Sequence, residues 1–400
     1  MNSNFKKKLP VAPLKILSLE SFMPMAEKID QLIVSMRHEE ASETKDPLML
    51  RGYNADSFLV QAKCPRFSSG EAKGLIQESI HGTDLYILAD ITNYSQTYHL
   101  YKCENQMSPD DHFQDLIRMI DACNGKAHRI NVILPFLYES RQDKRTNLES
   151  LDCATALQEL VHMGVKNIIT FDAHDPRVQN AIPIEGFDNF YTSFQFIQAL
   201  LGVEKNLNLS AGGLMIISPD EGGMSRAVFY ANILGLDMGM FYKRRDYTTI
   251  QDGKNPIVAH EFLGGDVEGR DVFIIDDMIS SGESVIDVAQ ELKLRKANKV
   301  FVAASFGLFT HGLSKFDEAY ENGIIDRVFT TNLIYCPKEL LSKPYYTNVD
   351  VSKYLALIIH TINHDNSVDA IVNATYRIKD IVKQYKEDRE LRNANNQVLE

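Results

Sequence analysis

The chain has 400 residues, of which 44% are hydrophobic, and its formal net charge at pH 7 is −12. A chain of this length is too long for one hydrophobic core, so we expect two domains. The acidic balance disfavours a general nucleic-acid-binding protein. The five scattered cysteines include no Cys-x-x-Cys pair, which indicates a reducing compartment rather than a disulfide or zinc framework.

The sequence contains no stretch of the ~20 apolar residues that a membrane-spanning helix needs. The polar segment 1–8 is not followed by the apolar run of a signal peptide. We therefore expect a cytoplasmic protein with no membrane partner.

Strand-like and helix-like segments alternate in the first half of the chain. Short apolar runs predict strands at 14–18, 84–89, 130–135 and 167–171. Apolar residues at helical spacing predict helices at 23–36, 111–123 and 153–163. The polar stretch 39–66 and the irregular stretch 94–110 are interpreted as surface insertions.

The second half repeats this alternation. Strands are predicted at 214–218, 239–242, 272–275, 300–306 and 327–333, and helices at 223–234 and from 285 onward. Buried apolar runs separated by helices are typical of parallel sheets, so the predicted class is α/β with two tandem domains, each a mainly parallel sheet flanked by helices. Glycine and asparagine cluster at 203–213, which predicts domains at 1–205 and 206–366.

The tail, 367–400, is predicted to form an extra C-terminal amphipathic helix over about 368–392. Its apolar residues lie on one stripe, which predicts packing on its own domain or on a neighbouring subunit. Recruitment of a partner protein is the alternative.

The most informative segment is 272–284, where an apolar strand is followed by paired carboxylates, a Ser/Gly loop and a helix. A small-residue loop before a helix directs N–H groups and the positive end of the helix dipole at a phosphate. The predicted donors are Ser280, Ser281, Gly282 and Ser284. Asp276 and Asp277 are placed to accept hydrogen bonds from sugar hydroxyls beside that phosphate. The segment predicts a sugar-phosphate site, and two solvated aspartates before a helix cap are the alternative.

Two further clusters follow strands in this half of the chain. Asp220, in the turn 218–223, is a candidate ligand for a divalent cation or, alternatively, an N-capping residue. Lys243 to Arg245 follow a predicted strand, and a mobile loop with these cations would stabilise a transferring phosphoryl group. A solvated charge run is the alternative for this loop.

Three clusters in the first half carry weaker signals. Arg141 and Gln142 lie in a basic cluster that indicates either surface charge or polyphosphate contact. His174 follows a predicted strand between aspartates and could be a metal ligand or a proton carrier. Phe67, in the segment 66–71, could stack on a purine, although a core phenylalanine is the usual interpretation.

In chain order these motifs resemble the ribose-phosphate pyrophosphokinase (phosphoribosyl pyrophosphate synthetase) family of the type I phosphoribosyltransferase-fold superfamily. The resemblance runs from about residue 14 to 373 and includes Ser218-Pro-Asp-Glu-Gly-Gly223, Lys243-Arg-Arg245 and Thr331-Asn-Leu-Ile-Tyr-Cys-Pro337. It implies transfer of the diphosphoryl group of Mg-ATP to the anomeric hydroxyl of ribose 5-phosphate. The products would be 5-phosphoribosyl 1-diphosphate and AMP.

The resemblance also implies roles for the residues in these motifs. Phe67, Glu71, Arg141 and Gln142 would contact ATP in the N-terminal domain. His174 and Asp220 would hold Mg²⁺, with Mn²⁺ as a possible substitute, and Lys243 and Arg245 would be catalytic. Asp276, Asp277, Ser280, Ser281, Gly282 and Ser284 would bind ribose 5-phosphate. The family further implies a homo-oligomer with active sites near subunit interfaces, and no nucleic-acid partner.

Departures from the family pattern mark a divergent member. Ser69 stands where the family usually has an aspartate, Ser280 lacks the expected carboxylate, and Ala173 and Asp175 flank the histidine in place of leucine and alanine. Two alternatives stay open: a phosphoribosyltransferase, which the Ser-Ser-Gly-Glu-Ser loop suits, and a catalytically silent regulatory subunit of a synthetase assembly.

Overall fold

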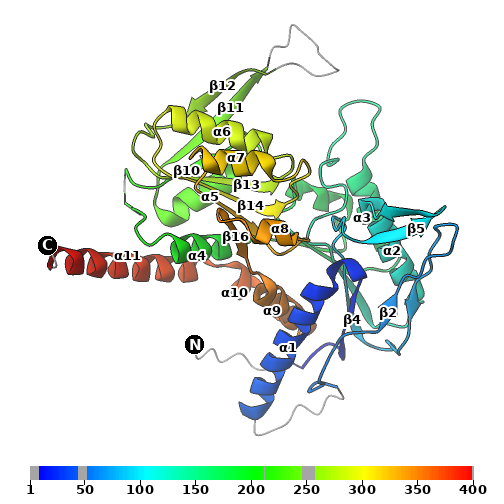
Figure 1. The fold of residues 1–400 in the computed structure, drawn as a ribbon. Coiled ribbons are helices and arrows are strands. Elements are labelled where there is room, and N and C mark those ends of the chain that lie inside the picture. The colour runs from blue at the N-terminus through cyan, green and yellow to red at the C-terminus, as the bar shows by residue number, and fades with distance from the viewer. Residues whose placement is uncertain (1–8, 44–51, 211, 246–256, 399–400) are drawn as a thin grey trace. The chain divides into compact units, whose positions relative to one another are not determined.

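The computed structural model describes residues 9–43, 52–210, 212–245 and 257–398. Contacts within the chain divide it into two compact units (Figure 1). Unit 1 comprises Met1–Tyr191, Asn332–Tyr335 and Asp350–Val372, and unit 2 comprises Thr192–Thr331, Cys336–Val349 and Asn373–Glu400.

Unit 1 is built on a five-stranded sheet in the order β1-β4-β7-β8-β9, and all of its neighbouring strands are parallel. The strands are β1 (Leu14–Ser18), β4 (Asp84–Leu88), β7 (Arg129–Ile133), β8 (Asn167–Phe171) and β9 (Gly186–Phe190). Every residue of β4 is buried, as expected for a parallel strand covered on both faces.

Helices flank this sheet. They are α1 (Met23–Glu43), α2 (Pro109–Ala122), α3 (Asp152–His162), α9 (Ser352–Asn363) and α10 (Asp369–Val372), with short 3₁₀ turns at Glu20–Phe22 and Pro176–Ala181. Helix α2 begins with a capping box in which the Ser108 and Asp111 side chains each accept a hydrogen bond from the other residue's backbone N–H. Two small hairpins, β2 (Ala62–Lys63) with β3 (Leu75–Ile76) and β5 (Thr97–Leu100) with β6 (Cys103–Gln106), complete the unit.

Unit 2 is built on a seven-stranded sheet in the order β12-β11-β10-β13-β14-β15-β16, in which only β11 and β12 pair antiparallel. Its strands are β10 (Met215–Ser218), β11 (Met238–Arg245), β12 (Ile257–Leu263), β13 (Val272–Ile279), β14 (Val300–Gly307), β15 (Arg327–Thr331) and β16 (Tyr346–Val349). Its helices are α4 (Ser193–Val203), α5 (Met224–Leu234), α6 (Glu283–Leu294), α7 (Ser314–Glu321), α8 (Lys338–Leu341) and α11 (Thr375–Val398). The predicted α/β class with mainly parallel sheets is confirmed.

Two predictions about strand ends in unit 2 are wrong. The predicted strand 272–275 continues to Ile279, so Asp276 and Asp277 lie inside β13, because Met278 and Ile279 still pair with Phe306 and Gly307 of β14. The segment Lys243–Arg245 ends strand β11 instead of forming a loop, because it pairs with β12.

The two stretches interpreted as insertions are more regular than expected. Segment 94–110 contains the β5–β6 hairpin. Within segment 39–66, the N–H of Ile16 donates to the Phe58 carbonyl at 2.8 Å and the N–H of Val60 donates to the Ile16 carbonyl at 2.7 Å, so this part runs along β1. Phe58 is buried, so the part of the segment around it packs in the core and is not only a surface insertion. Residues 44–51 lie outside the described residues.

The C-terminal helix packs on its own unit, one of the two options that its apolar stripe predicts. Helix α11 contacts α4 and α5, with Ile378, Val382 and Tyr385 buried. The Tyr385 hydroxyl donates to the Glu204 carbonyl at 2.7 Å and accepts from the Leu207 N–H at 2.8 Å. The predicted continuous helix is interrupted between α10 and α11, and Val372, at the end of α10, is exposed.

The contact-defined units differ from the predicted domain limits of 1–205, 206–366 and 367–400. Helix α4 belongs to unit 2, where it contacts β16 and α11. Residues 350–372 belong to unit 1, where α9 packs on α1. The predicted domain limits stay a proposal. In the part of the chain that the structure describes, no helix has both the length and the apolar character to cross a membrane.

A buried polar cluster joins α1 to α9 in unit 1. The Nδ1 of His364 bonds the His360 carbonyl oxygen at 2.7 Å, and its Nε2 lies 3.4 Å from the Tyr53 hydroxyl, which donates to Glu40 at 2.7 Å. Burial lowers the pKa of His364 to about 4. Burial opposes ionisation of Glu40, but hydrogen bonds from His360 and Tyr53 outweigh it and lower its pKa to about 2.

We expect the stability of unit 1 to fall as the pH drops from about 6.5, the pKa of an unfolded histidine, to 4. In that window His364 is protonated in the unfolded chain but stays neutral in the folded chain. The free energy of unfolding therefore falls by up to about 1.4 kcal/mol per pH unit. Glu40 adds a further loss only below about pH 4.3. Thermal melts of wild type and His364→Asn should show a flatter dependence in the variant between pH 6.5 and 4.5. An equal slope in both proteins would contradict this prediction.

Candidate active site

The carboxylates of Asp276 and Asp277 lie on the central strand β13 of unit 2. The N–H of Asp277 donates to Asp276 Oδ1 at 2.9 Å, and the N–H of Met278 donates to Asp277 Oδ1 at 2.8 Å. The side chain of Asp276 is 25% exposed and Asp277 is buried. Burial, together with the charge of Asp277, raises the pKa of Asp276 well above the ordinary value. The two neighbouring carboxylates repel each other, so hydrogen-bond donors or cations placed beside them would stabilise their charged forms.

The loop after β13 leads directly into helix α6. Gly282 has φ of +84°, and a Cβ there would stand 2.2 Å from Cε2 of Phe316, so the position needs glycine for its backbone and for space. The Ser280 carbonyl accepts the Thr310 N–H at 2.9 Å, which fixes the loop from outside. Ser280 and Ser281 thus lie in the loop and Ser284 in the first turn of a twelve-residue helix, whose N-terminus is a favourable place for an anion.

Asp220 lies in the turn between β10 and α5, and β10 pairs with β13. Its Oδ1 accepts the Gly223 N–H at 3.2 Å and so braces the turn, but the N-cap of α5 is Gly223, so the N-capping alternative for Asp220 is wrong. Its charge also contributes to the raised pKa of Asp276, which puts the two carboxylates within electrostatic reach. The pairing of β10 with β13 therefore places the Asp220 turn beside the strand that carries Asp276 and Asp277, although these carboxylates are up to 57 positions apart in the sequence.

The backbone of Lys243–Arg245 lies at the same edge of this sheet as the Asp220 turn, where the parallel strands have their carboxyl ends. Strand β11 runs parallel to β10, and Ser218 at the end of β10 pairs with Met240. The three residues that end β11 therefore extend beyond the carboxyl end of β10, in the direction of the Asp220 turn. Figure 1 shows β11 and β12 projecting together from unit 2.

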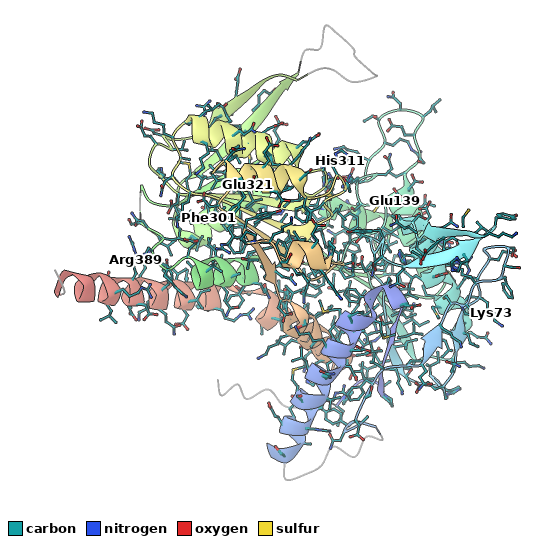
Figure 2. The ribbon with its side chains drawn as sticks, viewed as in Figure 1. Lys73, Glu139, Phe301, His311, Glu321 and Arg389 are labelled. Atoms are coloured by element: carbon teal, nitrogen blue, oxygen red, sulfur yellow. The ribbon has the colours of Figure 1, made fainter. Side chains whose placement is uncertain are left out.

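In unit 1, residues 66–71 form a tight turn. The N–H of Phe67 donates to the Glu71 carbonyl at 2.7 Å, and the N–H of Gly70, which has φ of +92°, donates to the Phe67 carbonyl at 2.9 Å. Phe67 is 52% exposed, so the interpretation as a core phenylalanine is wrong. Lys73, labelled in Figure 2, has its Nζ 6.0 Å from the Phe67 ring centre. The Ser69 hydroxyl donates to Glu71 Oε2 at 2.8 Å.

Arg141 and Gln142 lie in the loop that follows β7. The Gln142 side-chain amide donates to the Ser150 carbonyl at 2.8 Å and to the Lys144 carbonyl at 3.3 Å, so it holds its own loop together. Arg141 is exposed. The hydrogen bonds of Gln142 therefore hold the backbone of this loop, and its cationic side chains are exposed to solvent.

His174 follows β8 at the carboxyl end of the unit 1 sheet, and its side chain is exposed. The neighbouring Asp175 carboxylate accepts hydrogen bonds from the Arg177 side chain and backbone, which lower the pKa of Asp175 to about 2. Asp175 thus caps the turn after His174. Among the described residues, no three His, Cys, Asp or Glu side chains form a group that could enclose a metal ion.

Comparisons with known proteins place these motifs in one family. A model of the N-terminal domain of ribose phosphate pyrophosphokinase matches residues 14–164, and a model of the phosphoribosyl synthetase-associated domain matches residues 245–373. The ribose-phosphate pyrophosphokinase of Vibrio cholerae is 30% identical over 320 residues, which cover 79% of this chain and 92% of that protein. The chain belongs to the ribose-phosphate pyrophosphokinase family.

Further relatives agree with this assignment. The ribose-phosphate pyrophosphokinase of Vibrio parahaemolyticus is 28% identical over 323 residues, covering 79% of this chain and 92% of that protein. The crystal structure of phosphoribosylpyrophosphate synthetase from Mycobacterium smegmatis matches the fold with a TM-score of 0.68 at 20% identity, covering 88% of this chain and all of that one. Neither family model reaches helix α11.

One residue beside Asp276 carries no signal in the motifs of this ribose-phosphate pyrophosphokinase family member. Arg226 lies in the first turn of α5, and its Nη1 is 4.0 Å from Asp276 Oδ1. Its charge lowers the pKa of Asp276 against the stronger effects of burial and of Asp277. The available signal was its position in the first turn after the Asp220 motif.

Proposed function

We propose that this chain transfers the diphosphoryl group of Mg-ATP to the anomeric hydroxyl of ribose 5-phosphate, which gives 5-phosphoribosyl 1-diphosphate and AMP. The observation that carries this proposal is the juxtaposition in unit 2 of Asp276, Asp277 and Asp220 with the hydroxyl-rich loop before α6, in a chain of this family. The sugar oxygen forms a bond to the β-phosphorus, the bond from that phosphorus to the α,β-bridging oxygen breaks, and the anomeric proton is released.

Ribose 5-phosphate is assigned to unit 2. Ser280, Ser281, Gly282 and Ser284 would hold its phosphate at the positive end of α6, where N–H groups have no partner within the helix. Asp276 and Asp277 would accept hydrogen bonds from the ribose hydroxyls. Because these groups sit on a central strand and a braced loop, they would fix the direction of the anomeric hydroxyl.

The groups for ATP are assigned mainly to unit 1. The exposed ring of Phe67 would stack on the base, and Glu71 would accept a hydrogen bond from it. Arg141 would neutralise phosphate charge, and Gln142 would shape the same loop. Lys243 and Arg245, in unit 2, would stabilise the charge on the transferring group.

The residues present suit Mg²⁺, which needs few protein ligands, and they do not suit a metal that is coordinated by the protein alone. Mg²⁺ usually keeps several waters and binds one or two carboxylates together with substrate phosphates. Asp220 in unit 2 and His174 in unit 1 are each a candidate protein ligand that the family resemblance implies, and Mn²⁺ could replace Mg²⁺. The ion, when bound, would neutralise phosphate charge.

The test is an assay of the purified chain with ribose 5-phosphate, ATP and Mg²⁺ that follows AMP and phosphoribosyl diphosphate. We expect equal amounts of both products. Consumption of phosphoribosyl diphosphate with a nucleobase, and no AMP from ATP, would identify a phosphoribosyltransferase instead. No product in either assay, but a thermal shift on adding a partner synthetase, would identify a silent regulatory subunit.

We also propose self-association, because the family resemblance implies that the turn 66–71 reaches a neighbouring subunit. Light scattering after size-exclusion chromatography tests it, and a mass of 45.3 kDa at the assay concentration would contradict it.

A further inference from the structure

The face of strand β5 that is turned inward packs against the turn of residues 66–71. Along β5, Thr97 and His99 are exposed while Tyr98 and Leu100 are half-buried, the alternation of a strand with one covered face. Leu100 Cδ1 lies 3.0 Å from the point where a Cβ on Gly70 would stand. The β5–β6 hairpin thus contacts the turn at Gly70, the residue with the positive φ.

The same face reaches the other end of the turn. The Arg66 guanidinium lies 5.0 Å from the centre of the Tyr98 ring and forms an ion pair with Asp115 of α2 at 2.9 Å. Asp115 also binds Arg118 at 2.7 Å, and it is buried. Because Arg66 directly precedes Phe67, these contacts fix the backbone from which the exposed ring projects.

The turn 66–71 carries an apolar ring and a hydrogen-bond acceptor, a combination that suits a purine base. The Phe67 ring is a flat apolar surface open to solvent, and such rings bind purine bases by stacking. The Ser69 hydroxyl donates to Glu71 Oε2, which orients the carboxylate and leaves it able to accept a further hydrogen bond. An exocyclic amino group of a stacked base would supply that donor.

We propose that the β5–β6 hairpin is a positioning element for the base of the nucleotide substrate, acting through Leu100 and Tyr98 on the turn 66–71. The inference rests on the proposed function, in which Phe67 and Glu71 contact the base. Leu100 and Tyr98 do not touch the substrate. They hold the turn in the conformation that offers a stacking surface and an acceptor together.

The test compares Leu100→Ala with His99→Ala, a matched control on the exposed face of the same strand. We expect Leu100→Ala to raise KM for ATP by about 5- to 30-fold, the effect of a misplaced contact of moderate strength. The kcat and the KM for ribose 5-phosphate should stay unchanged. The His99→Ala protein should match wild type in all three. Tyr98→Leu should act like Leu100→Ala.

A fluorescent reporter measures binding without turnover. The chain contains no tryptophan, so Phe67→Trp introduces a single tryptophan at the exposed position of the turn, and its emission can be excited selectively over that of the tyrosines. ATP should change its emission and ribose 5-phosphate alone should not. Adding Leu100→Ala should shift the ATP midpoint by the same factor as KM, and adding His99→Ala should not.

The outcomes separate this inference from the proposed function. Equal ATP midpoints and KM values in the Leu100→Ala and His99→Ala proteins, with melting temperatures like wild type, would overturn the positioning role while synthesis of AMP continued. If the tryptophan emission of the Phe67→Trp protein responded to ATP with the predicted midpoints, but wild type formed no AMP, the proposed reaction would be overturned and the positioning role would stand.

Discussion

Replacing Lys243 with alanine should lower kcat by about 10²- to 10³-fold, the loss typical of removing one group that stabilises transition-state charge. The KM for ATP should change little, because the charge that Lys243 neutralises develops only as the diphosphoryl group moves. Steady-state kinetics with varied ATP and saturating ribose 5-phosphate measure both constants. Near-normal turnover would remove this segment from the mechanism.

Arg244→Ala is the matched control for this experiment. All three positions lie at the end of β11, and the family resemblance places roles on 243 and 245 but not on 244. We expect a loss from Arg245→Ala comparable to that from Lys243→Ala, and a much smaller one from Arg244→Ala. Similar losses in all three would mean that only the net charge of the segment matters. Raising the ionic strength would then reduce wild-type activity in the same way.

Asp277→Asn is expected to raise KM for ribose 5-phosphate by about 10- to 100-fold, because a hydrogen bond to a charged acceptor contributes about 1.5–3 kcal/mol. Asp276→Asn should have an effect of the same sign, and the KM for ATP should stay near wild type in both. The measurement is the dependence of the initial rate on ribose 5-phosphate at saturating ATP.

The matched control is Asp287→Asn, which removes an exposed carboxylate from α6 of the same unit. It should leave both KM values unchanged, since Asp287 lies outside the loop and β13. If Asp277→Asn raised KM for ATP instead of KM for ribose 5-phosphate, the assignment of the sugar to unit 2 would be wrong. Melting temperatures must accompany these assays, because Asp277 is buried.

Much of the candidate site was predictable because its parts are local. An apolar run, two carboxylates and a Ser/Gly loop determine a strand, acceptors and a helix N-terminus without help from distant residues, as in 272–284. The turn around Asp220 is local in the same way. The chemistry of each motif therefore follows from the sequence.

Other features depended on partners far away in the chain. Strand β13 continues through Asp276 and Asp277 because β14 continues beside it, and no pattern within 272–279 signals that pairing. Likewise, Lys243–Arg245 is a strand because β12 pairs with it. The Arg226 contact with Asp276 exists because β10 lies next to β13 in the sheet.

By itself the sequence determined the α/β class, the motifs and their chemistry, since short-range periodicity and loop composition encode them. Only the tertiary structure decided that residues 332–335 and 350–372 return to unit 1, that α11 packs on α4 and α5, and that the β5–β6 hairpin braces Gly70. The physical reason is that burial and strand pairing join residues more than ten positions apart, where local preferences carry no information about the partner.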